Sequence, residues 1–535
     1  MPVTLPLFEE VPMAAATPQE QLMLELVNRA RLNPTAEAAR YGLALSAAQK
    51  TPRDVLAMNA DLYDAATNHT AWMLRYDIFS HTETTGVAPW KTGTTPQQRV
   101  NHTGYNGLAG ENIAWTGSLP AVPNPTASIL ELHKGLFLSA GHRANILNAT
   151  YDEIGIDQTA GKFLSSGTNW NASMVTQVFG VPNVDRVFVT GVIYRDTVTN
   201  DNFFTVGEQR PSKAVSSPGQ NKTTGAGGGY ELSYAPGAGV TQITIDGKVV
   251  SLNLSTRNVK LDLVNDREIW TDGNVTLIST TITEVHALGL KAMSMRGTTA
   301  SEKFFGNDAA NLIFGEAGND RLDGDGGADR LFGGIGNDIY VVDNASDTVN
   351  ETGASGTDTV QASVNWNLAN AARVLGDIER LMLTGTAKNG FGNGLDNLIY
   401  GNSSANSLSG AAGNDILRGS LGNDTLRGGL DQDTFIFNTT PNTSTNRDTI
   451  SDFTPADDVI HLENAIFAKL GAAGALNPAF FRVGARALDA NDYIVYHRGS
   501  GALFYDADGN RAGAAIQFAT LTTEPLITAA DFRVI

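Results

Sequence analysis

Residues with oxygen-bearing side chains recur at a fixed spacing of nine in the second half of the chain. Glycine opens the nine-residue units, at Gly306 and every ninth residue to 333, and again at Gly392 and every ninth residue to 428. The sixth residue of every unit is Asp or Asn. The aspartates are Asp320, Asp329, Asp338, Asp415, Asp424 and Asp433, and the asparagines are Asn311, Asn397 and Asn406. Stacked carboxylate and turn carbonyl oxygens are the ligands that a hard cation such as calcium prefers.

The eighth residue of each unit is apolar, which predicts a thin stacked core. These residues are Ile313, Leu322, Leu331, Tyr340, Ile399, Leu408, Leu417, Leu426 and Phe435. Glycine permits the positive φ of a tight turn, so each unit predicts one turn and one short strand. A flexible Gly/Asp-rich linker, the alternative, has no apolar residue at a fixed period. The pattern resembles the RTX (repeats-in-toxin) family, which implies a calcium-loaded parallel β-roll.

Stacked aspartates repel one another when no ion is present, and each thin unit buries little apolar surface. We therefore expect calcium binding and folding of the repeats to be one event. The Asn-bearing units open each block, and we expect them to be caps or weak sites.

Five segments in the first third of the chain resemble the CAP superfamily in its cysteine-free bacterial form. They are Asn28-Arg29-Ala30-Arg31, Phe79-Ser80-His81-Thr82-Glu83, Gly110-Glu111-Asn112-Ile113-Ala114, Ser139-Ala140-Gly141-His142-Arg143-Ala144-Asn145-Ile146-Leu147 and Val175-Thr176-Gln177-Val178-Phe179-Gly180. The resemblance implies an α–β–α sandwich with an open cleft over about residues 17–182.

The same resemblance implies that His81 and Glu111 line this cleft, with His142 and Glu83 close by. His81, Glu111 and His142 are the candidate catalytic residues, and two imidazoles with a carboxylate would suit Zn²⁺ or another divalent ion. Met174 stands where many family members have another cleft histidine. The alternative is a buried hydrogen-bonded network that ties loops to helices.

Other catalytic signals are missing from the sequence. It has no Gly-x-Ser-x-Gly elbow, no His-Glu-x-x-His motif and no cysteine nucleophile. We expect His69 to be a core histidine and His133 to lie on the surface. Whether the protein is an enzyme stays open.

A polar segment after the cleft region is a further candidate calcium site. Asp196, Asn200, Asn202 and Glu208 could surround an ion, and an ordinary polar hairpin turn explains them equally well.

Local patterns predict the elements that position these residues. Thr17, Pro18 and Glu20 are typical of a helix start, and Asn33-Pro34 ends that helix. Further helices are predicted over about 59–74 and 126–138, and a strand over 174–179. Beyond 186, short β segments alternate with turns.

The predicted organisation is multidomain. It comprises a flexible leader (1–16), the α–β–α sandwich (17–182), a β-rich, sandwich-like spacer (186–297), a first β-roll block (298–343), an inter-block β segment (344–391), a second block (392–437) and a C-terminal β region (438–535).

Composition favours an exported protein. The 535 residues carry a formal charge of −19, which argues against nucleic acid and anionic membranes as partners, and they include no cysteine. Met1 to Asn28 does not read as a cleavable export signal, and no apolar stretch is long enough to span a membrane. The C-terminal region resembles that of serralysin-like proteins, which implies an uncleaved type I secretion signal and an extracellular location.

Three functions remain open at this stage. The first is a secreted calcium-binding protein whose cleft holds a small apolar, lipid or peptide ligand. The second is a metal-dependent hydrolase with His81 and His142 as metal ligands and Glu111 as general base. The third is an extracellular adhesion or matrix protein.

Overall fold

The first helix begins at the residues that the sequence signals predict. The structure, a computed structural model, describes residues 16–87, 94–353 and 355–535. Thr17 Oγ1 accepts a hydrogen bond from the backbone N–H of Glu20, and the Glu20 carboxylate accepts one from Thr17 N, at 3.2 and 2.7 Å. This capping box starts α1 (Pro18–Leu32). The expected leader, apart from Ala16, lies outside the described residues.

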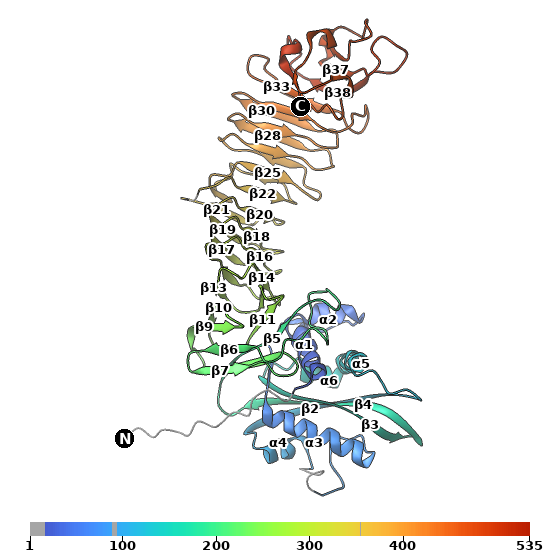
Figure 1. Ribbon diagram of the computed structural model, residues 1–535, viewed down its shortest axis with the longest axis vertical. Helices are drawn as coiled ribbons and strands as arrows, with labels where there is room; N and C mark the ends of the chain where they lie inside the picture. Colours follow the sequence, from blue (N-terminus) through green and yellow to red (C-terminus); the bar gives the residue numbers. More distant parts are fainter. Residues whose placement is uncertain (1–15, 88–93, 354) are drawn as a thin grey trace, which may run out of the picture. The chain divides into compact units, whose positions relative to one another are not determined.

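A four-stranded sheet in the order β1-β3-β4-β2 lies between two layers of helices (Figure 1). The strands are β1 (Ala57–Met58), β2 (Gly107–Ser118), β3 (Glu153–Ser165) and β4 (Thr168–Pro182), and the remaining helices are α2 (Pro34–Arg40), α3 (Ala60–Tyr76), α4 (Pro96–Thr103), α5 (Pro125–Leu138) and α6 (Ala140–Ile146). Val175 and Phe179 of β4 pack in the core formed with α1, α5 and α6, while Val178 packs with α3 and α4. This alternation confirms the predicted α–β–α sandwich.

The rest of the first unit is β structure. Its strands are β5 (Val187–Tyr194), β6 (Ala214–Ser217), β7 (Gln220–Thr223), β8 (Gly229–Tyr234), β9 (Gly239–Ile245), β10 (Lys248–Leu254), β11 (Val259–Val264), β12 (Glu268–Thr271), β13 (Val275–Leu277), β14 (Glu284–Ala287) and β15 (Ser294–Arg296). Strands β12 and β14 pair in parallel, as do β13 and β15, so parallel coiling starts before the first glycine repeat.

Met1–Arg296 and Gly297–Ile535 form two separate compact units. The sandwich and the β-rich spacer therefore share one unit. Buried Lys260 of β11 joins them, because its ammonium group pairs with Glu25 of α1 at 2.6 Å and with Asp262 at 2.8 Å.

The second unit contains a parallel β-roll in which the chain returns to the same ladder after two nine-residue units. One ladder contains β16 (Lys303–Phe305), β18 (Arg321–Asp323), β20 (Ile339–Val342), β22 (Thr359–Ala362), β25 (Arg380–Leu383), β27 (Leu398–Tyr400), β29 (Ile416–Arg418), β31 (Thr434–Phe437) and β33 (Val459–Leu462). Leu322 pairs in register with Phe304 on one side and Tyr340 on the other, and all three are fully buried. The eighth-position residues thus form the predicted thin core.

The opposite ladders complete the coils. They contain β17 (Leu312–Ala317), β19 (Arg330–Ile335), β21 (Thr348–Glu351) and β24 (Val374–Gly376), and then β23 (Trp366–Asn367), β26 (Asn389–Phe391), β28 (Ser407–Ala412), β30 (Thr425–Leu430) and β32 (Asp448–Ile450). Between the two glycine blocks the coil continues with longer turns. Ile339 pairs with Thr359 and Thr359 with Arg380, offsets of 20 and 21 residues instead of 18.

The C-terminal region closes the roll with strands of mixed direction. They are β34 (Gly474–Ala475), β35 (Phe481–Val483), β36 (Ile494–His497), β37 (Ala502–Tyr505), β38 (Ile516–Leu521) and β39 (Phe532–Val534). Strand β39 pairs in parallel with β33, so the end of the chain belongs to the roll's own sheet. No helix in the described ranges has the length and apolarity needed to cross a membrane.

Candidate functional site

The six sixth-position aspartates have the same geometry, and each precedes a strand of the roll. One carboxylate oxygen, Oδ1, accepts a hydrogen bond from the backbone N–H of the residue 18 positions earlier. These bonds join Asp320 to Glu302, Asp329 to Asn311, Asp338 to Asp320, Asp415 to Asn397, Asp424 to Asn406 and Asp433 to Asp415, at 2.7–3.1 Å. The other oxygen, Oδ2, is buried in all six and has no hydrogen-bond partner among the described residues. Such orphaned oxygens are costly unless something binds them.

The first-position glycines leave the space that these oxygens occupy. A Cβ added to Gly410 would lie 2.0 Å from Asp415 Oδ2 and 2.6 Å from the carbonyl oxygen of Gly428. A Cβ on Gly324 would lie 2.2 Å from Asp329 Oδ2. Carboxylate and turn carbonyl oxygens therefore converge in a cradle that a larger residue would fill.

Burial makes the six aspartates hard to ionise when no cation is present. Desolvation, opposed by the backbone hydrogen bond, raises the pKa to about 7 for Asp320, Asp329, Asp415, Asp424 and Asp433 and to about 6 for Asp338. A divalent cation would compensate these charges, and the all-oxygen donor set fits calcium. Bound calcium would tie successive turns together through the Oδ2 atoms.

The asparagine units use an amide group in the corresponding place. Asn406 Nδ2 donates to the carbonyl oxygen of Ala387 at 3.0 Å, and Asn311 Nδ2 donates to that of Ala309 at 2.6 Å. Asn397 Nδ2 donates to the carbonyl of Ile378 at 3.2 Å. An –NH₂ group that bonds turn carbonyls needs no cation, which supports a role as neutral caps.

The structure adds acidic residues that the sequence analysis missed. Glu302, Asp347, Asp358, Asp448 and Asp458 are buried, and the four aspartates accept the same kind of backbone hydrogen bond. Extending the nine-residue count in both directions would have found Glu302 and Asp347. The other three follow longer turns, so a fixed count could not reach them.

In the sandwich, the cleft residues form a network around Glu111 of β2. His81 Nδ1 lies 2.8 Å from Glu111 Oε1, and buried His69 of α3 lies 3.7 Å from the same oxygen. Arg99 of α4 pairs with Glu111 Oε2. Burial opposes ionisation of Glu111, but the hydrogen bond with His81 and the charges of His69 and Arg99 hold its pKa below the ordinary value. The side chain of His81 is 48% exposed, so it presents this network to solvent.

One expectation for this region, the surface position of His133, needs correction. Glu83 joins the Glu111 network, since it pairs with His69 at 3.1 Å and lies 3.8 Å from Arg99. His133 is fully buried, because its imidazole bonds Glu37 of α2 at 3.0 Å. His69 is a core histidine, as expected, although it also belongs to the Glu111 network.

A zinc ion in the cleft is not supported. Both oxygens of Glu111 already have partners, and one of these is the permanent cation of Arg99, which would repel a metal. His142 of α6 lies near the network, since its carbonyl oxygen accepts a hydrogen bond at 3.1 Å from Asn112, the residue after Glu111. Burial and the charge of His81 lower the pKa of His142. In the part of the chain that the structure describes, His81, Glu111 and His142 are not among the groups of three donors within 4.8 Å. The arrangement is that of the hydrogen-bonded alternative.

The candidate calcium loop of the spacer uses its carboxylates to bind its own backbone. Asp196 accepts hydrogen bonds from the N–H groups of residues 201 and 202, and Glu208 accepts them from residues 197, 198 and 205. Asn200 and Asn202 have φ of 51° and 59°, a conformation that asparagine tolerates well. This geometry favours an ordinary polar loop.

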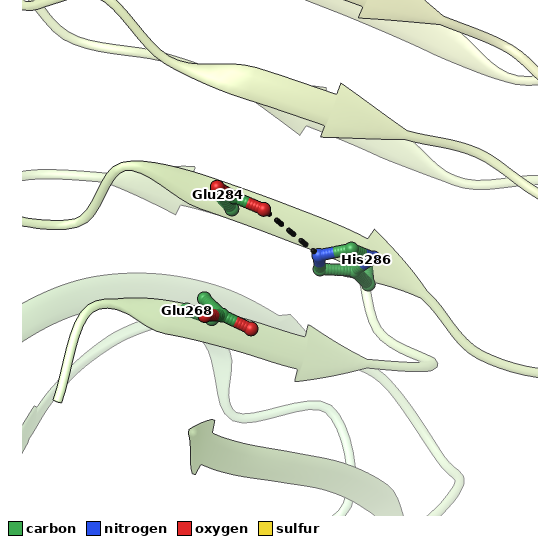
Figure 2. Close-up of side chains that lie close together, drawn as sticks. All are labelled: Glu268, Glu284 and His286. Carbon is green, nitrogen blue, oxygen red and sulfur yellow. Dashed lines mark ion pairs between the residues drawn. The ribbon is translucent and has the colours of Figure 1, made fainter. Parts of the chain in front are cut away.

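Figure 2 shows a cluster in the spacer that the sequence analysis did not predict: Glu268, Glu284 and His286. Glu268 and Glu284 are register partners on β12 and β14, and His286 Nε2 lies 3.6 Å from Glu284 Oε2. The imidazole also stacks on Trp270, with ring centroids 4.1 Å apart. A protonated His286 would offset part of the charge of the two glutamates.

A cavity of about 960 Å³ lies in the first unit, away from the Glu111 network. Its lining includes Tyr63, Tyr105, Arg186, Ser216 and Tyr230, and none of His81, Glu111 and His142. Glu153, at the wall, accepts a hydrogen bond from the Tyr105 hydroxyl at 2.8 Å. The volume and the mixture of aromatic and polar walls are typical of small-molecule sites.

Comparison with known proteins identifies two parts of the chain. The RTX calcium-binding nonapeptide repeat matches, in four copies, over residues 305–340 and 391–435, and the cysteine-rich secretory protein family (CAP) matches over 24–162. The chain therefore contains RTX calcium-binding repeats in its second unit. It carries a CAP domain in its first unit. No curated protein matches the sequence significantly.

Solved structures resemble parts of the chain. An extracellular protein with an SCP domain from Bacillus anthracis is 23% identical, over 30% of this chain and 40% of that one, with a TM-score of 0.18. An outer surface protein from Borrelia burgdorferi is 16% identical, over 31% and 93%, with a TM-score of 0.20. An extracellular lipase from Serratia marcescens is 18% identical, over 46% and 40%, with a TM-score of 0.14. The chain thus spans two fifths of the Bacillus protein's length.

Proposed function

We propose that this is a secreted calcium-binding protein whose repeat region folds when it meets extracellular calcium. The observation that carries the proposal is the set of six buried Oδ2 atoms, each without a partner among the described residues. In the cytosol, calcium is too scarce to fill sites of the extracellular affinity class, about 10⁻⁴–10⁻³ M, so the roll would stay unfolded until export. Type I secretion, which takes unfolded chains, suits a protein without cysteines.

Circular dichroism during a calcium titration tests this proposal. Adding CaCl₂ to about 10⁻³ M to the chelator-treated full chain should increase the β signal, and renewed chelation should reverse the gain. The helical signal of the CAP domain should stay constant, because its helices pack on apolar cores without a metal. Magnesium at the same concentration is the control. A β signal that does not change with calcium would refute the proposal.

For the CAP-bearing unit we propose binding of a small apolar or lipid ligand, or of a peptide. The cavity of about 960 Å³ supports this, because it can enclose a ligand of that size and has apolar walls with a few polar groups. The hydrolase alternative would need a metal beside Glu111, where Arg99 already supplies the positive charge. The adhesion alternative has no specific support from the described residues.

Mass spectrometry of material extracted from the purified chain checks the ligand proposal. Ser216 lines the cavity, so Ser216→Trp should reduce co-purified ligand about tenfold or more by filling it. His81→Ala alters the cleft but not the cavity, and it should leave the ligand in place. If His81→Ala loses the ligand and Ser216→Trp keeps it, the ligand binds in the cleft and not in the cavity.

A further inference from the structure

The end of the first repeat block has a glutamate where the repeat has glycine. Counting by nine from Gly306 leads through Gly333 to Val342 and then to Glu351, at the end of β21. Glu351 is 4% exposed and lies beyond residues 305–340, which the repeat family matches. It is therefore a buried acid that the repeat pattern does not explain.

Glu351 meets two buried aspartates of the neighbouring turns. The ligand atoms of Asp338, Glu351 and Asp358 all lie within 4.8 Å of one another. Asp338 and Asp358 are 1% and 2% exposed, and the backbone N–H of Asp338 donates to Asp358 Oδ1 at 2.7 Å. The Tyr340 hydroxyl donates to Glu351 Oε1. Two oxygens that face this space, Asp338 Oδ2 and Glu351 Oε2, have no partner among the described residues.

The position of Glu351 corresponds to that of a turn carbonyl in the other sites. A Cβ on Gly315 would lie 2.4 Å from Asp320 Oδ2 and 2.6 Å from the carbonyl oxygen of Gly333, one coil later. A Cβ on Gly333 would lie 2.3 Å from Asp338 Oδ2 and 2.6 Å from Glu351 Oε1. A carboxylate of the next coil thus stands where an ordinary site has a carbonyl.

The three acids lack an internal counter-charge. No Lys, Arg or His in the described ranges pairs with Asp338, Glu351 or Asp358. Burial, and then the charges of Asp358 and Asp338, raise the pKa of Glu351 to about 9. Without a cation, the three groups cannot all be ionised at neutral pH.

We propose that Glu351 is a calcium ligand from outside the repeat motif, which closes the last site of the first block together with Asp338 and Asp358. The inference rests on the proposed calcium-dependent function of the roll. Glycine at this position offers only its carbonyl, whereas glutamate adds a full negative charge. Because calcium affinity rises with the charge of the ligand set, this site fills before the other sites of the block.

Competition with a chromophoric calcium chelator tests the proposal on the full chain. Glu351→Gln keeps the shape of the side chain and removes its charge. One tight site should weaken about tenfold or more, while the other sites keep their affinity. Glu316→Gln, the same change at an exposed glutamate of the same block, should leave every site unchanged.

A second measurement, made without calcium, should show an effect of Glu351→Gln in the opposite direction, because the substitution should then favour the folded roll. In excess chelator, Glu351→Gln should increase the residual β signal of the roll in circular dichroism, since it removes a buried acid that has no counter-charge. Both effects together identify a ligand. Calcium affinity equal to that of Glu316→Gln, or a smaller residual β signal in chelator, would overturn the role of Glu351. Failure of the proposed function itself would look different, because the unmodified chain would then bind no calcium.

Discussion

At the scale of single residues, the roll depends on the different roles of the two carboxylate oxygens of each aspartate. Oδ1 of Asp424 accepts a backbone N–H from the previous coil, while Oδ2 is buried without a partner among the described residues. The first oxygen holds the side chain in place, and the second is left for a cation. Asn406, one coil earlier, meets the turn carbonyl through its amide instead. Under the proposed function, the choice between Asp and Asn decides which turns need calcium.

The burial of these carboxylates without a counter-charge among the described residues predicts that protons can partly replace calcium on them. The pKa of Asp320 and of four equivalent aspartates is raised from 3.8 to about 7 in the folded roll. A raised folded-state pKa means that the folded chain binds more protons than the unfolded chain, so stability falls as pH rises through 7. In chelator, the roll should therefore keep more β signal at about pH 5 than at about pH 8.

Circular dichroism spectra in chelator at the two pH values measure this difference. Saturating calcium is the control, because the cation displaces the protons and should largely remove the advantage of the lower pH. Equal β signals in chelator at the two pH values would show that these aspartates titrate as they do in the unfolded chain.

At the scale of elements, each turn of the roll is shaped around its oxygens. Gly410 lies so close to Asp415 Oδ2 that an added Cβ would be 2.0 Å from this oxygen. The same Cβ would be 2.6 Å from the carbonyl oxygen of Gly428 in the next coil. In the CAP domain, by contrast, the helices are set by local caps and by apolar faces on the sheet, such as Val175 and Phe179 of β4. The turns are therefore more sensitive to added volume than to lost apolar surface.

Gly410→Ala should consequently weaken the calcium-loaded roll by about 1–3 kcal/mol, because the new methyl group pushes two cation-facing oxygens apart. Gly394→Ala is the matched control in the same block, since an added Cβ there meets no atom within 4 Å. Melting in saturating calcium compares the two variants. A Gly410→Ala roll as stable as the control would mean that the turn can relax around the methyl group.

At the scale of the whole molecule, the two units gain stability in different ways. Unit 1 has a large apolar core, and buried Lys260 joins its helical and β parts through Glu25 and Asp262. The repeats of unit 2 stack about one fully buried apolar side chain per nine-residue unit, as Leu322 illustrates. A core this thin needs the additional ties between turns that calcium would supply. The calcium titration proposed above separates these two origins of stability.

Much of the roll could be predicted because its signals are local and repeated. The spacing of Asp320, Asp329 and Asp338 and the apolar eighth residues depend on neighbours in the sequence, and so does the capping box at Thr17 and Glu20. The pattern stopped being informative where turns lengthen, as between Asp338 and Asp358.

The CAP domain showed the limits of motif reading. His81 and Glu111 do meet, as the resemblance implies. The motif did not indicate that Arg99 pairs with Glu111, or that His133 is buried against Glu37, 96 residues away. Each of these pairings depends on how helices pack on the sheet and on one another rather than on spacing.

The sequence by itself determined the calcium-binding repeat, the helix starts and the kind of core, because short-range periodicity specifies turns, strands and faces. Only the tertiary structure decided which acids converge. It brought Glu351 back to Asp338, left one oxygen of each aspartate buried without a partner among the described residues, and placed a cation beside Glu111 in the cleft. The physical reason is that charge and burial depend on all neighbours in space, and a coil or a sandwich brings together residues that no fixed interval connects.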